Sequence, residues 1–158
     1  MANPSSVHKP RSERPFELKE VPKPRPISTY KWIPLVGRVL FSSVFILGSF
    51  GHFTQGYINM AAQNGMPAAS VFVPLSGVLA LVGGLSILTG YRARQGAWLL
   101  VLFLVPVTLV MHNFWSISDP AAAMGQKVNF MKNLAMLGGA LLIAYFGSGP
   151  LSVDHRHK

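Results

Sequence analysis

The sequence lacks cysteine and is poor in acidic residues: its 158 residues include no cysteine and only five aspartates and glutamates. Without cysteine there can be no disulfide, thiolate-held iron–sulfur cluster, cysteine zinc site or thiol nucleophile. Charged residues make up 12% of the chain, against about 25% in soluble domains. Hydrophobic residues make up 50%, so the composition indicates a single domain embedded in a lipid bilayer.

The few acidic residues also lie outside every long hydrophobic segment. Glu13, Glu17 and Glu20 are near the N-terminus, Asp119 falls in a predicted loop, and Asp154 is near the C-terminus. Proton relays and di-metal sites within membranes use carboxylates that project from the spans. The sequence therefore excludes a carboxylate relay and a carboxylate-bridged di-metal centre, and it predicts no metal site.

Basic residues and prolines concentrate in the first 31 residues. This segment holds half of the 14 lysines and arginines and half of the 12 prolines. Because such segments neither form continuous helix nor bury apolar surface, residues 1–31 are predicted to be a disordered cytoplasmic tail. The basic residues favour contact with anionic membrane lipid. Aromatic residues are not interleaved with them, so nucleic-acid binding is not predicted.

Long uncharged runs predict four membrane-spanning helices. A span needs about 20 mostly apolar residues. Turn-rich breaks at residues 54–69, 91–94 and 116–129 leave helices at roughly residues 33–53, 70–90, 95–115 and 130–147. We therefore expect an all-α fold, an integral membrane four-helix bundle over residues 32–150, followed by a short cytoplasmic C-terminal tail at residues 151–158.

The placement of the basic residues predicts the direction of the spans. With four spans both termini lie on one side, which then carries twelve of the 14 lysines and arginines; the other side has only Lys127 and Lys132. By the positive-inside rule both termini face the cytoplasm. Arg38 and Asp154 fall on this side and are predicted to form a structural ion pair, because buried charges are usually paired.

Small residues spaced four apart predict how the helices pack. Ser76, Ala80 and Gly84 lie in the second predicted span, and Ala135 and Gly139 lie in the fourth. Helices in a bilayer associate where small residues let their backbones approach closely. These faces join helices within one bundle or join two subunits of a homo-oligomer, and the sequence leaves both arrangements open.

Polar residues of three predicted spans reach the same, outer face of the bundle. They are His52, His112, Asn113, Trp115, Lys132 and Asn133. Ionisable residues inside a membrane are costly and are functional candidates. We expect them to surround the polar head of a lipophilic ligand such as a quinone, with which an imidazole can exchange a proton. The alternatives are hydrogen bonds between helices and to headgroups, or a haem held by two histidines.

The order of the motifs resembles the DoxX family of small four-span membrane proteins. The matching motifs are Gly37-Arg38, Gly65-Met66-Pro67, Gly83-Gly84-Leu85, Pro106-Val107-Thr108, His112-Asn113-Phe114-Trp115, Phe130-Met131-Lys132-Asn133-Leu134 and the stretch from Gly147 to Asp154. The resemblance implies a bacterial inner-membrane protein, with relatives linked to quinone-dependent oxidoreductase complexes. Because the chain has no flavin or nicotinamide motif of its own, we also expect a partner subunit that supplies the redox chemistry.

Three functions are consistent with these features. The first is a membrane subunit of an oxidoreductase complex that binds quinone or quinol at the outer face, since the chain has no flavin or nicotinamide motif of its own. The second is a non-catalytic scaffold that recruits partner proteins to the membrane. The third is a small carrier, which the lack of an internal repeat and of a midplane charge disfavours.

Overall fold

The computed structural model describes residues 30–156, and every regular element in this range is a helix. The long helices are α1 (Trp32–Ser49), α3 (Ala69–Thr89), α4 (Ala93–Met111) and α5 (Pro120–Phe146). The shorter elements are the 3-10 turns η3 (Phe50–Phe53) and η4 (Phe114–Ser116) and the helices α2 (Gln55–Gln63) and α6 (Val153–Arg156). The predicted disordered tail lies, apart from Tyr30 and Lys31, outside the described residues.

The four long helices are long and apolar enough to cross a membrane. With the turns that extend them, the candidate spans are Trp32–Phe53, Ala69–Thr89, Ala93–Ser116 and Pro120–Phe146, with mean hydropathies of 1.8, 2.2, 2.0 and 1.3. Large apolar side chains cover the outside: Leu47, Leu142 and Phe146 are 72%, 60% and 70% exposed. Soluble monomers rarely expose so much apolar surface, whereas lipid tails cover it readily. The predicted all-α four-helix membrane bundle is confirmed, and the protein is a multi-pass membrane protein.

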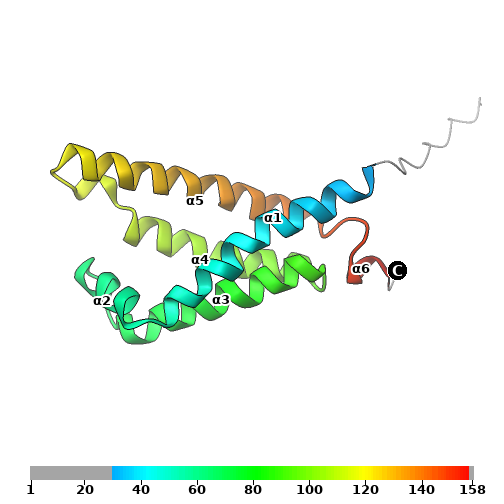
Figure 1. The fold of residues 1–158 in the computed structure, drawn as a ribbon, viewed down its shortest axis with the longest axis horizontal. Helices are drawn as coiled ribbons and strands as arrows, with labels where there is room; N and C mark the ends of the chain where they lie inside the picture. The colour runs from blue at the N-terminus through cyan, green and yellow to red at the C-terminus, as the bar shows by residue number, and fades with distance from the viewer. Residues whose placement is uncertain (1–29, 157–158) are drawn as a thin grey trace, which may run out of the picture.

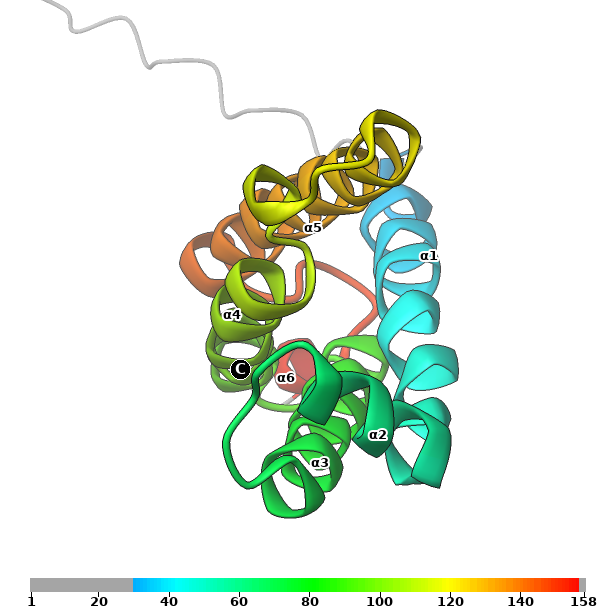
Figure 2. The same cartoon turned by 90° about the vertical axis from the view of Figure 1, so that its left-hand side faces the viewer.

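The bundle is elongated, and helices that follow one another in the chain pack side by side (Figure 1). Helix α1 packs against α3, α3 against α4, and α4 against α5. The end-on view shows the same order around the bundle axis (Figure 2). Helix α2 crosses one end of the bundle, and α6 lies at the opposite end. We call these the α2 end and the α6 end.

The first and last long helices meet at one level of the bundle and then diverge. Phe41 of α1 lies close to Gly139 of α5: a Cβ at Gly139 would be 2.8 Å from the Cε2 atom of Phe41. Beyond this contact α1 and α5 separate toward the α2 end, as both ribbon views show (Figures 1 and 2). The predicted small residue Gly139 thus serves this contact, whereas Ala135 is exposed.

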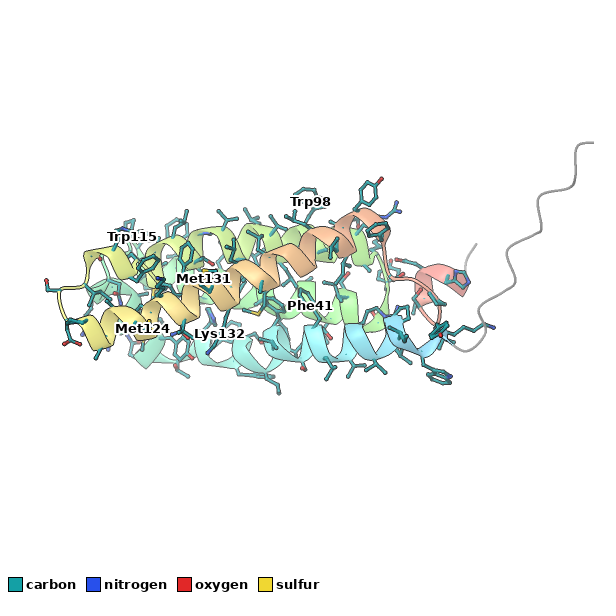
Figure 3. All side chains as sticks on the ribbon, turned by 90° about the horizontal axis from the view of Figure 1, so that it is seen from above. Phe41, Trp98, Trp115, Met124, Met131 and Lys132 are labelled. Carbon is teal, nitrogen blue, oxygen red and sulfur yellow. The ribbon has the colours of Figure 1, made fainter. Side chains whose placement is uncertain are left out.

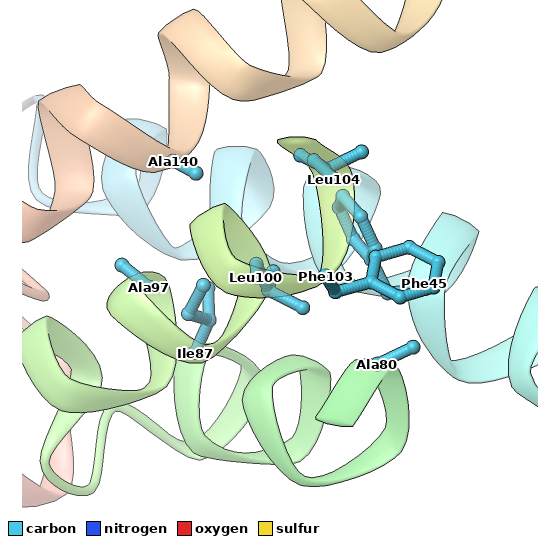
Figure 4. Close-up of a cluster of buried hydrophobic side chains, with 8 residues drawn as sticks. All are labelled: Phe45, Ala80, Ile87, Ala97, Leu100, Phe103, Leu104 and Ala140. Carbon is cyan, nitrogen blue, oxygen red and sulfur yellow. The ribbon is translucent and has the colours of Figure 1, made fainter. Parts of the chain in front are cut away.

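Apolar side chains from α1, α3, α4 and α5 fill the centre of the bundle. They are Phe45, Ala80, Ile87, Ala97, Leu100, Phe103, Leu104 and Ala140 (Figure 4). Two glycines let α3 approach both of its neighbours: Gly83 lies against Leu100 and the Gly96 carbonyl of α4, and Gly84 lies against Ile46 of α1. The small residues of the second span therefore pack within one bundle.

Two segments that were predicted to be loops, residues 54–69 and 116–129, are partly helical. Helix α5 begins at Pro120 rather than near Phe130, because the Asp119 carboxylate accepts a hydrogen bond from the Ala122 amide at 2.7 Å and caps the helix. Proline suits the first position of a helix, where its missing N–H is not needed. With 27 residues, α5 is about 40 Å long at about 1.5 Å per residue. It therefore exceeds the hydrocarbon core, which is about 30 Å thick. Helix α2 lies within the first predicted break.

At the α6 end, Arg38 and Asp154 do not form the predicted direct ion pair. Arg38 is 4% exposed and donates from Nη2 to the Leu151 carbonyl at 2.6 Å. Asp154 instead accepts from the backbone amides of Arg92 and Ala93, at 2.9 and 3.2 Å. The prediction is wrong because the positive end of the α4 helix dipole satisfies the carboxylate. Each side chain separately fastens the C-terminal segment, residues 147–156, to the bundle.

Candidate functional site

A cavity of about 310 Å³ lies toward the α2 end, where α1 and α5 diverge. Val44 and Gly48 line it from α1, and Asn133 and Met136 line it from α5. Residues of η3, α2, α3 and α4 complete its wall. Pockets for small molecules have volumes of about 300–1,000 Å³. This cavity therefore fits a small ligand or one end of a larger one.

His52 enters the cavity from η3, and its hydrogen bonds identify which ring nitrogen carries the proton. Its Nδ1 atom lies 2.8 Å from the Ser76 hydroxyl of α3. That hydroxyl donates its own proton to the Val73 carbonyl at 2.7 Å. A hydroxyl has one proton to donate, so Ser76 accepts from Nδ1–H of His52. The neutral imidazole consequently keeps Nε2 as a hydrogen-bond acceptor.

Packing holds the His52 ring in this orientation. The ring centroid lies 5.4 Å from that of Tyr57 on α2 and 5.5 Å from that of Phe103 on α4. On α3, a Cβ at Gly77 would be 2.7 Å from Cβ of His52, so this position requires glycine. The ring is thus fixed by contacts with three helices before any ligand binds.

His112, which ends α4, reaches the same cavity and is held by α5. Its Nδ1 atom lies 2.7 Å from the side-chain carbonyl oxygen of Gln126. Because an amide oxygen only accepts hydrogen bonds, His112 donates from Nδ1 and keeps Nε2 as an acceptor in its neutral form. Both histidines therefore have the same tautomer. Among residues 30–156, no group of three or more histidines and acids is placed to hold a metal ion.

Methionines form much of the apolar wall of the cavity. Of the six methionines between residues 30 and 156, four line it: Met60, Met66, Met111 and Met136. Methionine is unbranched and polarisable, so methionine-rich surfaces adapt to ligands of different shape. The cavity thus combines an adaptable apolar wall with two fixed polar groups.

The structure divides the six residues predicted from the sequence into two groups. His52, His112 and Asn133 line the cavity, and Asn113, Trp115 and Lys132 are not part of its lining. Trp115 is 60% exposed on the outside of the bundle, where its ring packs on Phe130 (Figure 3). Lys132 is exposed, and its Nζ atom lies 3.5 Å from the Asn129 side chain.

The residues that hold the two imidazoles were not predicted from the sequence. Ser76 was assigned only to helix packing, and Gln126 was placed in a loop. Gln126 and Asn133 are seven residues apart, so they lie on one face of α5. This spacing could not be used for the prediction, because the helix was expected to begin near Phe130 and Gln126 then lies outside it. Tyr57 was missed because α2 was not predicted.

Almost the whole chain matches one family of membrane proteins: the SURF4 family model covers residues 11–158. The chain belongs to the SURF4 family. The earlier resemblance to DoxX proteins is therefore wrong. Motifs such as Gly83-Gly84 have a packing role in this bundle, and any small bundle of four spans needs such close approaches. They carry little information about the family.

This SURF4-family chain is similar to proteins of bacteria and yeast. It is 31% identical to inner membrane protein YqjF of Escherichia coli over 120 residues, 76% of this chain and 88% of that protein. It is 25% identical to inner membrane protein YphA of Escherichia coli over 124 residues, 77% of this chain and 88% of that protein. It is also 31% identical to ER-derived vesicles protein ERV29 of Saccharomyces cerevisiae over 81 residues, 51% of this chain and 26% of that protein. No solved structure matches the chain.

The family assignment also corrects the predicted function. A subunit of a quinone-linked oxidoreductase was expected from the polar residues at the outer face and from the DoxX resemblance, and membership of the SURF4 family overturns that expectation. The partner subunit with redox chemistry stays a prediction that these comparisons do not test. The membrane assignment and the convergence of His52 and His112 on one cavity do not depend on the family.

Proposed function

We propose that this protein is a non-catalytic membrane receptor that holds a short apolar segment of a client polypeptide in the cavity at its α2 end. The observation that carries this proposal is an apolar, methionine-lined cavity with two imidazoles, each fixed through Nδ1. The relative ERV29 is named an ER-derived vesicles protein. This name supports a role in vesicle transport.

The chemistry of the cavity suits a peptide segment. An extended peptide offers backbone N–H donors beside its side chains, and the Nε2 atoms of His52 and His112 are not used in the hydrogen bonds that hold the two rings. A volume of about 310 Å³ accommodates a few side chains rather than a folded domain. The adaptable methionine wall admits apolar side chains of different shape, as a receptor with several clients requires.

We further propose that the protein lies in the inner membrane with both termini in the cytoplasm, so that the α2 end faces outward. The names of YqjF and YphA support a location in the inner membrane. The distribution of lysine and arginine supports the orientation. Because the chain has no cysteine, single cysteines report topology directly. With intact cells, a membrane-impermeant maleimide is expected to label Asn64→Cys but not Gln95→Cys. The opposite pattern would overturn the orientation.

Site-specific photo-crosslinking tests the receptor proposal. A benzophenone amino acid replaces Met66, which lines the cavity, or Trp98, which is 58% exposed on the outside of α4 (Figure 3). Crosslinking is carried out in cells, and mass spectrometry identifies the adducts. Polypeptide adducts are expected at position 66 and lipid adducts at position 98. Lipid adducts alone at both positions would contradict the proposal.

Two glycines of α1 provide a matched pair of blocking variants. A Cβ at Gly48 or at Gly37 meets no atom within 4 Å, but only Gly48 lines the cavity. Gly48→Leu is expected to fill the cavity mouth and to reduce polypeptide adducts at position 66 at least fivefold. Gly37→Leu is expected to leave them unchanged within twofold. Equal effects of the two substitutions would show that the adducts do not report cavity binding.

A further inference from the structure

A second cavity, of about 670 Å³, lies at the α6 end. On one side it is lined by Tyr91 and Arg92 of the turn between α3 and α4 and by Arg94 in the first turn of α4. On the other side it is lined by Phe146 and the turn at residues 147–149, which follows α5. The receptor proposal does not involve this cavity.

Two guanidinium groups face this cavity and have no acceptor among the residues that the structure describes. Within residues 30–156 the side chains of Arg92 and Arg94 make no hydrogen bond or ion pair. The Arg92 guanidinium lies over the Tyr91 ring, with Cζ 5.6 Å from the ring centroid. Arg94 lies against Gly147, where a Cβ would be 3.3 Å from its Nε atom. The two cations are therefore held in place by contacts that leave their donors available.

The acidic residue of the cavity is already engaged. Asp154 directs its two carboxylate oxygens to the backbone amides of Arg92 and Ala93, which begin α4. It therefore does not contact the arginine side chains, and the cavity keeps an excess of positive charge. Arginine presents several N–H donors in a planar fork that matches phosphate oxygens.

The backbone at Arg92, on one side of the cavity, is held in an unusual conformation. Arg92 has a φ of 49°, in the left-handed region that non-glycine residues avoid. Gly147 and Gly149 on the other side have φ values of 83° and 69°, which glycine adopts readily. Conformations such as that of Arg92 persist where the surrounding structure enforces them, and they concentrate at functional sites. Here the three residues turn the chain so that both sides of the cavity are formed by short, fixed segments.

The position of the cavity along the bundle indicates what kind of anion reaches it. Tyr91 and Phe146, at the ends of two spans, are 53% and 70% exposed. Aromatic side chains at the ends of spans lie at the level of lipid headgroups. We propose that this cavity binds the phosphate of an anionic phospholipid, with Arg92 and Arg94 as its ligands and the acyl chains beside Phe146.

Native mass spectrometry of the full-length protein in detergent tests this site. Phosphatidylglycerol is titrated, with phosphatidylcholine as the zwitterionic comparison. We expect one phosphatidylglycerol to bind at least fivefold more tightly than phosphatidylcholine. In the double variant Arg92→Asn with Arg94→Gln this affinity is expected to fall at least tenfold. Asparagine is chosen at position 92 because it tolerates the left-handed conformation.

Two controls separate the site from general charge effects and from misfolding. Lys31→Gln with Lys127→Gln removes the same charge from exposed residues outside the cavity, and phosphatidylglycerol affinity is expected to change less than twofold. Arg94→Lys keeps the charge and is expected to retain the affinity within fivefold. Equal losses in the two double variants, or no loss in either, would overturn the proposal.

A competition experiment distinguishes a phospholipid ligand from free inorganic phosphate. Inorganic phosphate at millimolar concentration is expected not to displace phosphatidylglycerol, because it lacks the acyl chains that Phe146 contacts in the proposed complex. If inorganic phosphate displaces the lipid and this displacement depends on Arg92 and Arg94, the cavity is a site for free phosphate. The proposal of a phospholipid ligand is then wrong.

Discussion

The contact between α3 and α4 makes a quantitative prediction for Gly83→Ala. A Cβ at Gly83 would lie 2.7 Å from a Leu100 methyl group and 2.8 Å from the Gly96 carbonyl oxygen. Leu100 can change rotamer, but the backbone oxygen cannot move without its helix. Ordinary contact begins near 3.4 Å, so α4 would have to withdraw by about 0.6 Å. Overpacking of this kind costs about 1–3 kcal/mol.

Gly138→Ala is the matched control for this substitution. Gly138 lies within α5, and a Cβ there meets nothing within 4 Å. Both variants gain the same helix propensity, up to about 1 kcal/mol, so the difference between them isolates the clash. We expect Gly83→Ala to be about 1–3 kcal/mol less stable than Gly138→Ala, as measured by unfolding in detergent micelles. Equal stability of the two variants would refute the close packing of α3 on α4.

Three further substitutions test the helix caps and the attachment of the C-terminal segment. Asp119→Ala removes the cap of α5 and is expected to cost about 1 kcal/mol, measured by thermal unfolding against Ser118→Ala as control. Asp154→Ala removes two hydrogen bonds at the start of α4 and is expected to cost about 1–2 kcal/mol; no change in the melting temperature would contradict this role. Arg38→Ala removes the bond to the Leu151 carbonyl. It is expected to raise hydrogen exchange of residues 147–156 at least tenfold, while exchange in the centre of α4 stays within twofold.

Composition and hydropathy were sufficient to predict the four spans, because the bilayer imposes one length and one polarity on every helix that crosses it. The same reasoning failed where helices continue outside the hydrocarbon core. There the decisive signals are local, as Asp119-Pro120 shows: a carboxylate caps the first amides of α5, and proline occupies its first position. Hydropathy alone therefore placed the start of α5 near Phe130.

The end of the bundle at which the candidate site lies was predictable from the sequence, but the contacts between its residues were not. Alternating direction of the spans brings His52 and His112 to the same end of the bundle, and both line one cavity. Their hydrogen-bond partners come from other helices, Ser76 on α3 and Gln126 on α5. Which residues face each other across helices depends on the rotation of each helix about its axis, and hydrophobic periodicity is weak in spans that are apolar on all sides.

The two ends of the bundle differ in a way that fits the proposed receptor function. At the α6 end, the C-terminal segment is attached to α1 through Arg38, and to the turn between α3 and α4 through Asp154 and the Gly90 carbonyl. At the α2 end, α1 and α5 diverge beyond Phe41, and α5 extends past the thickness of the hydrocarbon core. Attachment at the α6 end keeps the spans joined there. The receptor proposal therefore predicts that a client enters between α1 and α5 at the α2 end while the contacts of the α6 end stay intact.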